Sequence, residues 1–125
     1  MKIVDFGIDE DCLVFSNEYK DIDECFENVK DFSGYFINEC ESGLIDSIDE
    51  KEFIEYFEND SGEIEKVKFK VMVDEINEFL KNNSDYVLVS FCVEYDNSFL
   101  LISSDDWNEL KSRSEKYINE LEEEY

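Results

Sequence analysis

YVLVSFCVEYDNSFLLIS, residues 86–103, is the clearest β-hairpin pattern in this 125-residue chain. Its two halves are rich in β-branched and aromatic residues and flank the polar turn YDNS, as paired antiparallel strands do. Apolar side chains at alternate positions from Val87 to Val93 share one face, and Leu88 and Cys92 make the other face partly apolar. We therefore expect the first half of the hairpin to be a central strand of a sheet.

The segments on either side of the hairpin predict further elements. After it, Ser103-x-x-Asp106 is typical of a helix N-terminus. The buried stripe of that helix would be Trp107, Leu110, Tyr117 or Ile118, and Leu121. Before the hairpin, residues 66–73 (KVKFKVMV) alternate lysine or methionine with large apolar residues, which predicts a strand with one wet face. Residues 74–83 then predict a helix.

The N-terminal third has the pattern of two strands and a helix. Residues 2–8 and 12–16 predict short strands joined by the acidic turn Asp9-Glu10-Asp11. From Asp21 the apolar period becomes helical, which predicts an amphipathic helix to about Asp31. We expect Ser33-Gly34 to end this helix.

The middle of the chain is the hardest part to interpret. Residues 35–50 fit either a helix or a strand, and Gly43 marks a break within them. Residues 47–58 predict a short helix, because Ser47-x-x-Glu50 is a capping pattern and apolar residues follow at helical spacing. A turn is expected at residues 59–62, NDSG.

Together these elements predict an α+β fold. We expect residues 1–125 to form a single acidic domain, with an antiparallel sheet of about four or five strands and three to four helices packed mainly on one face. No segment has the length and apolarity of a membrane span or the pattern of a signal peptide. The four cysteines lack metal-ligand spacing, so we expect reduced, packed thiols and a cytoplasmic protein.

The composition argues against most catalysis. Histidine is absent, which excludes Ser–His and Cys–His nucleophiles, and the four glycines are too scattered for a phosphate-binding loop. Placing Gly43 or Gly62 at the glycine of an EF-hand loop leaves its ligand positions without the required acids. Asp5, Glu18 and Lys20 could be assembled into a nuclease-like set, but exposed strand and turn charges explain them better. We expect no catalytic residue, no metal and no cofactor.

Acidity is the dominant feature of the surface. The formal net charge is −24, from 35 acidic residues against ten lysines and one arginine. Residues 21–65 alone carry sixteen acids and two lysines, and carboxylates recur there at helical intervals of three and four. Tyrosines in the same stretch could anchor a contact. The candidate partner-binding residues are Asp23, Glu24, Glu27, Asp31, Tyr35, Glu39, Glu41, Glu55, Tyr56 and Glu58.

These observations lead to a functional hypothesis. The chain is expected to be an acidic protein inhibitor that blocks the positively charged, nucleic-acid-binding surface of a partner. The setting would be an immunity protein that neutralises a nuclease toxin, or a phage-type nucleic-acid mimic that blocks a defence nuclease. A surface this acidic repels nucleic acid, and direct nucleic-acid binding is therefore not expected. The alternative is a non-enzymatic adaptor or regulatory module, and an enzyme acting through carboxylates ranks third.

Overall fold

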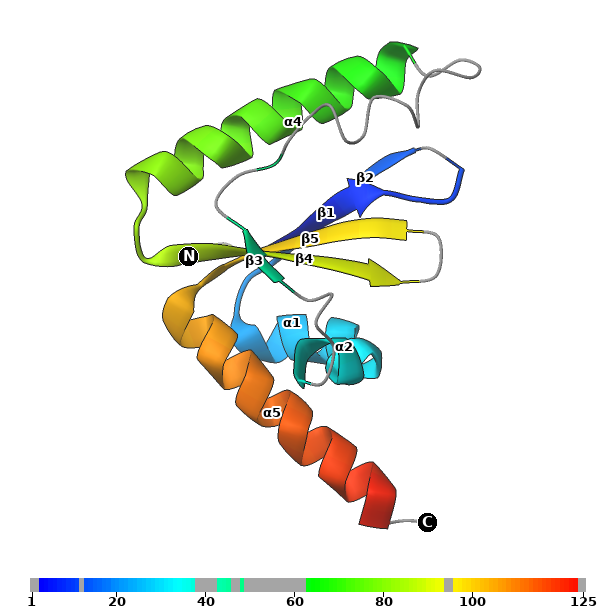
Figure 1. Cartoon of the computed structure of the whole chain (residues 1–125), viewed down its shortest axis with the longest axis vertical. Helices are drawn as coiled ribbons and strands as arrows, with labels where there is room; N and C mark the ends of the chain where they lie inside the picture. The colour runs from blue at the N-terminus through cyan, green and yellow to red at the C-terminus, as the bar shows by residue number, and fades with distance from the viewer. Residues whose placement is uncertain are drawn as a thin grey trace.

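One antiparallel sheet of five strands, in the order β2-β1-β5-β4-β3, organises the fold (Figure 1). The computed structural model describes residues 3–11, 13–37, 43–45, 48, 63–93 and 96–123. The strands are β1 (Ile3–Ile8), β2 (Val14–Tyr19), β3 (Gly43–Ile45), β4 (Tyr86–Val93) and β5 (Asp96–Ser103). The helices are α1 (Ile22–Val29), the 3-10 turn η1 (Lys30–Phe32), α2 (Ser33–Ile37), α4 (Glu63–Asn82) and α5 (Ser104–Glu123).

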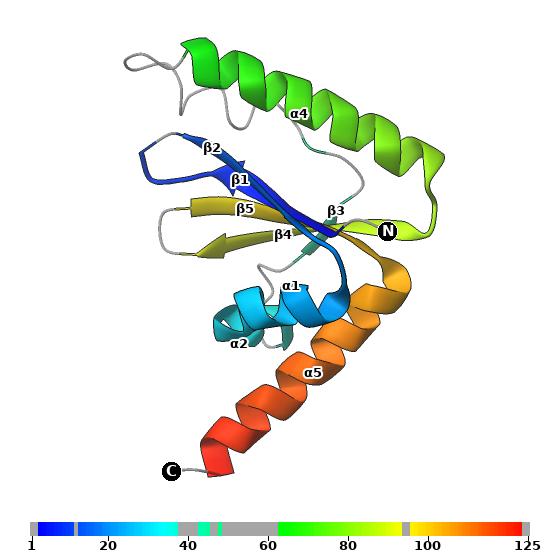
Figure 2. The same ribbon diagram turned by 180° about the vertical axis from the view of Figure 1, so that it is seen from behind.

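Helices cover both faces of the sheet (Figures 1 and 2). α1, α2 and α5 pack on one face, where Trp107 and Leu110 of α5 join Val89 and Leu100 of the sheet in a buried core. The long helix α4 packs on the other face. Its core residues there are Phe69, Val73 and Ile76, which meet Phe6, Ile8, Leu88, Phe99 and Leu101 from the sheet. The predicted α+β domain is confirmed, with most of its described helices on one face.

The two predicted hairpins are present, with shifted ends. β4 and β5 pair from Tyr86↔Ser103 to Val93↔Asp96, so β5 begins at Asp96 and includes residues that the sequence placed in the turn. β2 spans Val14–Tyr19 rather than residues 12–16. The Asp9 carboxylate accepts hydrogen bonds from the backbone N–H groups of Asp11 and Leu13, at 3.0 and 2.9 Å, and so closes the predicted acidic turn. The ends of β2 and β5 are therefore set by pairing with the neighbouring strand, and not by the turn residues alone.

The strand predicted at residues 66–73 is wrong, because this segment is the first half of α4. Alternating lysines imitate a strand, but Phe69, Val73 and Ile76 also fall at helical spacing and are the residues that become buried. Val67 and Val71, which a strand would have buried with Phe69, remain 60% and 52% exposed on the outer side of the helix. The helix predicted at residues 74–83 therefore starts a full eleven residues earlier, at Glu63.

The predicted end of the first helix is also wrong. The chain passes from α1 through the η1 turn into α2, which begins at Ser33. The Ser33 hydroxyl donates to the carbonyl of Lys30 at 2.6 Å, so the serine stabilises the turn instead of ending the helical path. Of the ambiguous stretch 35–50, the first residues are helical and Gly43 starts the short edge strand β3. The helix predicted at residues 47–58 and the turn at 59–62 lie outside the described residues, apart from the buried Ile48.

Within the described ranges, no helix is both long and apolar enough to cross a membrane.

Candidate acidic docking surface

Two acidic helical segments lie on the same face of the sheet (Figure 1). Residues 21–32, which contain α1 and η1, carry five carboxylates and one lysine, and residues 104–123 of α5 carry seven carboxylates and three bases. Each segment has a net charge of −4, and we call the two together the acidic layer. They touch directly, because the rings of Phe26 and Tyr117 meet edge to face with centroids 6.1 Å apart. The fold thus places on one face charges that lie some eighty residues apart in the chain.

The first helix is built so that its carboxylates face away from the core. Asp21 is the N-cap and accepts a hydrogen bond from the backbone N–H of Glu24 at 2.9 Å. Asp23 and Glu24 lie in the first turn, where the helix dipole favours negative charge. Cys25 and Val29 are buried, so the carboxylates on the remaining sides of the helix are exposed.

A single arginine connects the two segments. Arg113 Nη1 lies 2.6 Å from Asp23 Oδ1, and Arg113 Nε lies 2.9 Å from Glu109 Oε1. The hydrogen bond to Glu109 and, to a smaller extent, the hydrogen bond to Asp23 raise the pKa of Arg113 above its ordinary value. Glu27 pairs with Lys30 at 3.1 Å. These pairs offset part of the repulsion between the helices and leave most of the negative charge uncompensated.

The structure describes half of the residues predicted for the site. Asp23, Glu24, Glu27 and Asp31 all lie exposed on α1 or η1, and Tyr35 lies in α2. Within the described part of the chain, Glu24 and Asp31 form no salt bridge, whereas Asp23 and Glu27 do. Five predicted residues lie outside the described ranges, namely Glu39, Glu41, Glu55, Tyr56 and Glu58. The described four form one row along one helical segment.

The sequence prediction missed the contribution of α5. Exposed carboxylates at Asp105, Glu109, Glu115, Glu120 and Glu122 extend the acidic layer along this helix. A signal was present, since the last 21 residues carry eight acids against three bases. It could not be assigned to the same surface as residues 21–32, because only the fold brings the two segments together.

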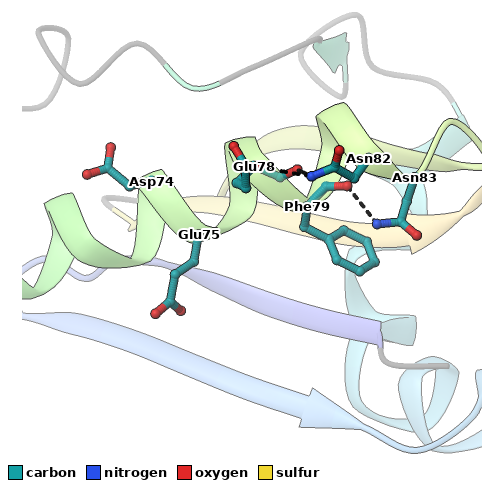
Figure 3. A pocket seen from close by; sticks show the side chains of 6 residues that line it. All are labelled: Asp74, Glu75, Glu78, Phe79, Asn82 and Asn83. Carbon is teal, nitrogen blue, oxygen red and sulfur yellow. Dashed lines mark hydrogen bonds between the residues drawn. The ribbon is translucent and has the colours of Figure 1, made fainter.

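The helix on the opposite face of the sheet, α4, has a different character. α4 carries five carboxylates and four lysines, for a net charge of −1. A shallow hollow of about 500 Å³ lies along its C-terminal half (Figure 3). Six residues line it, namely Asp74, Glu75, Glu78, Phe79, Asn82 and Asn83. The Asn82 amide donates to Glu78 Oε1 at 3.1 Å, and the Asn83 amide donates to the carbonyl of Phe79 at 2.8 Å, so both amides are already engaged within the helix.

The Asp5 carboxyl group is partly buried and lies beneath the acidic layer. The Tyr19 hydroxyl donates to Asp5 Oδ2 at 3.4 Å, and Asp5 Oδ1 is buried with no hydrogen-bond partner among the described residues. Burial raises the pKa of Asp5 to about 6, although the hydrogen bond from Tyr19 acts in the opposite direction. Burial, together with the charges of Asp5 and Asp106, raises the pKa of the Cys25 thiol to about 12. This thiol is therefore a poor nucleophile at neutral pH.

The described residues offer little for metal or nuclease chemistry. In ranges 3–11, 13–37, 63–93 and 96–123, and at the few other described positions, no three His, Cys, Asp or Glu residues gather in a way that could hold a metal ion. Asp5 and Tyr19 share one face of the sheet, so Glu18, adjacent to Tyr19, points to the other. Asp5 and Glu18 therefore cannot converge on one substrate, which rules out the nuclease-like set weighed from the sequence.

Comparison of the chain with protein-family models, curated proteins and solved structures found no match.

Proposed function

We propose that this protein is an acidic inhibitor that binds and blocks the positively charged, nucleic-acid-binding surface of another protein. The observation that carries the proposal is the acidic layer, in which two adjoining helical segments place a net charge of −8 on one face of a sheet while the helix on the other face is nearly neutral. A charge that served only solubility would be distributed over both faces.

The physical basis is electrostatic complementarity. Carboxylates at i+3 and i+4 on a helix stand roughly 5–6 Å apart, which is comparable to the spacing of phosphates along a nucleic-acid strand. A surface of this kind accelerates association with a basic partner, up to about 10⁸–10⁹ M⁻¹s⁻¹ at low salt. The same surface repels nucleic acid itself, so the proposed partner is a basic protein, such as a nuclease, and not DNA, RNA or a membrane.

The biological setting is part of the proposal. An immunity protein that neutralises a nuclease toxin and a phage-type mimic that blocks a defence nuclease both need this surface. A cytoplasmic location suits either one, and the free, buried thiol of Cys25 is compatible with a reducing compartment.

A non-enzymatic adaptor is the second candidate, and one observation favours it. Val67 and Val71 are more than half exposed one helical turn apart on α4, beside Lys66 and Lys70. An adaptor would use such an apolar surface, and its affinity would depend little on salt.

Capture followed by competition tests the proposal. The wild-type protein and a variant carrying Glu24→Gln, Glu27→Gln and Asp31→Asn are used as baits in extract of the host cell. A control variant carries Asp74→Asn, Glu75→Gln and Glu78→Gln, which removes the same three charges from α4. We expect a basic protein that is retained by wild type and control, is lost from the first variant, and is displaced by added duplex DNA or RNA. A partner that nucleic acid does not displace would contradict the proposal.

A further inference from the structure

Asp5 occupies an unusual position for a carboxyl group. It lies in β1, paired with Asn17 of β2 on one side and Leu100 of β5 on the other. Ile3, two residues earlier on the same face, is 1% exposed and belongs to the core under α1 and α5. The Asp5 side chain therefore points into the interface between the sheet and the acidic layer.

The surroundings of this carboxyl group provide almost no compensation for a negative charge. Within the described part of the chain, Oδ1 is buried without a hydrogen-bond partner, and the other oxygen accepts only the 3.4 Å bond from Tyr19, which is long for an O–H donor. In the ranges that the structure describes, the titratable groups that face this cluster are Tyr19 from β2, Cys25 and Glu24 from α1, and Asp106 from α5. None of these groups is a cation, so ionised Asp5 would be a partly buried charge in an already negative environment.

We propose that Asp5 is a pH-sensitive switch beneath the acidic layer, whose neutral form holds α1 firmly on the sheet and whose ionised form loosens it. The inference goes beyond the proposed function, because it rests on the fold alone and needs no partner. Burial raises the pKa of Asp5 from 3.8 to about 6, which agrees with the missing hydrogen bonds.

The direction of the effect follows from this shift. In an open state the carboxyl group is solvated and ionises near pH 3.8, whereas in the closed state it keeps its proton until about pH 6. The closed state therefore loses stability as the pH rises from about 4 to about 6, and the loss is complete above that range. Acidification locks α1 onto the sheet, and neutral pH leaves it easier to open.

Hydrogen exchange of the peptide that covers α1 tests the inference. The wild type is compared with Asp5→Asn, which is uncharged at every pH and keeps the shape of the side chain. After correction for intrinsic exchange rates, the opening equilibrium constants of the two proteins should be similar near pH 4 and differ by about 10- to 100-fold at pH 7, with the wild type more open. The exposed Asp31→Asn is the matched control and should follow the wild type at both pH values. If the ratio of the two opening equilibrium constants, wild type to Asp5→Asn, were the same at pH 4 and at pH 7, the proposed switch would be wrong.

A direct titration covers the case in which Asp5→Asn does not fold. The carboxyl carbon of Asp5 is followed by NMR in the wild-type protein as the pH is changed. We expect a midpoint near 6, as the burial of the group indicates, and a higher midpoint in Tyr19→Phe, which lacks the one hydrogen-bond donor. A wild-type midpoint near that of an ordinary aspartate, about 4, would exclude the switch.

Discussion

The helices described on the two faces of the sheet bury similar apolar cores and differ in net charge. The acidic layer carries a net charge of −8 and includes the single arginine of the chain, whereas α4 on the other face carries −1 and four of the ten lysines. Both layers contribute fully buried side chains, among them Leu110 from α5 and Val73 from α4. The described helices of the two faces are therefore alike in their buried apolar side chains and differ in the charge that they expose.

The helices of the two faces are also attached differently. Arg113 ties α5 to α1 by an exposed ion pair with Asp23. α4 is fixed by hydrogen bonds to backbone groups of its neighbours, because Asn77 bonds both the N–H and the C=O of Ile48, at 3.1 and 3.4 Å, and Glu65 Oε2 accepts from the N–H of Val14 at 2.8 Å. On one face a single arginine thus offsets a small part of the repulsion between acidic helices, and on the other face the near-neutral helix is held by partly buried polar contacts.

Removing a large core side chain from each layer should have the largest effect. Trp107→Ala in α5 and Phe69→Ala in α4 remove rings that are 6% and 3% exposed, and each should lower the free energy of unfolding by about 3–5 kcal/mol. Trp107 also loses its edge-to-face contact with Phe36, at 5.8 Å. Chemical denaturation measures both losses. A change below about 1 kcal/mol for Phe69→Ala would mean that α4 is peripheral and that the two layers are not equivalent in folding.

Breaking the polar attachment of α4 should have the next largest effect. Asn77→Ala leaves two backbone groups of Ile48, a residue 5% exposed, without their partner, and should lower stability by about 1–3 kcal/mol. Asn82→Ala is the control, because among the described residues the Asn82 amide bonds only Glu78 of its own helix. Equal denaturation midpoints for Asn77→Ala and Asn82→Ala would show that the contact with Ile48 does not hold α4.

Breaking the ionic attachment of the acidic layer should have the smallest effect on stability. Arg113→Met removes both ion pairs and should lower stability by roughly 0.5–1 kcal/mol at low salt, and the loss should shrink as salt is added. Lys116→Met removes an equal charge from a weaker pair, 4.0 Å from Glu120 within the same helix, and should be close to neutral. The proposed role of Arg113 would be wrong if the two variants unfolded alike at every salt concentration.

Much of this fold could be predicted from the sequence, and the errors have a common cause. Alternation identified β1 and β4, the hairpin pattern identified β5, and helical spacing identified α1 and, with a capping pattern, α5, because those patterns depend only on nearby residues. At residues 66–73 the same residues satisfy both periods, and packing against Phe99 and Leu101 of the sheet selects the helix. Local pattern alone could not make that choice.

The candidate site could be predicted only along one segment. The row Asp23, Glu24, Glu27 and Asp31 follows from helical spacing, and the structure places it on one exposed surface. The Asp23–Arg113 pair joins residues 90 positions apart, so neither it nor the share of α5 in the acidic layer is visible in local sequence. A count of charge along the chain therefore identified the α1 half of the layer and did not join it to α5, while the predicted residues between 39 and 58 lie outside the described ranges.

The most direct test of the central claim is the affinity of the captured basic partner, measured across salt concentration for the wild type and the two triple variants. Each variant has the same net charge of −21, so only the location of the lost charges differs. We expect the α1 variant to bind about tenfold or more weakly at low salt, with a shallower dependence on salt, and the α4 variant to bind within about twofold of the wild type. Equal weakening by both variants, or a wild-type affinity that does not change with salt, would contradict a docking surface located on the acidic layer.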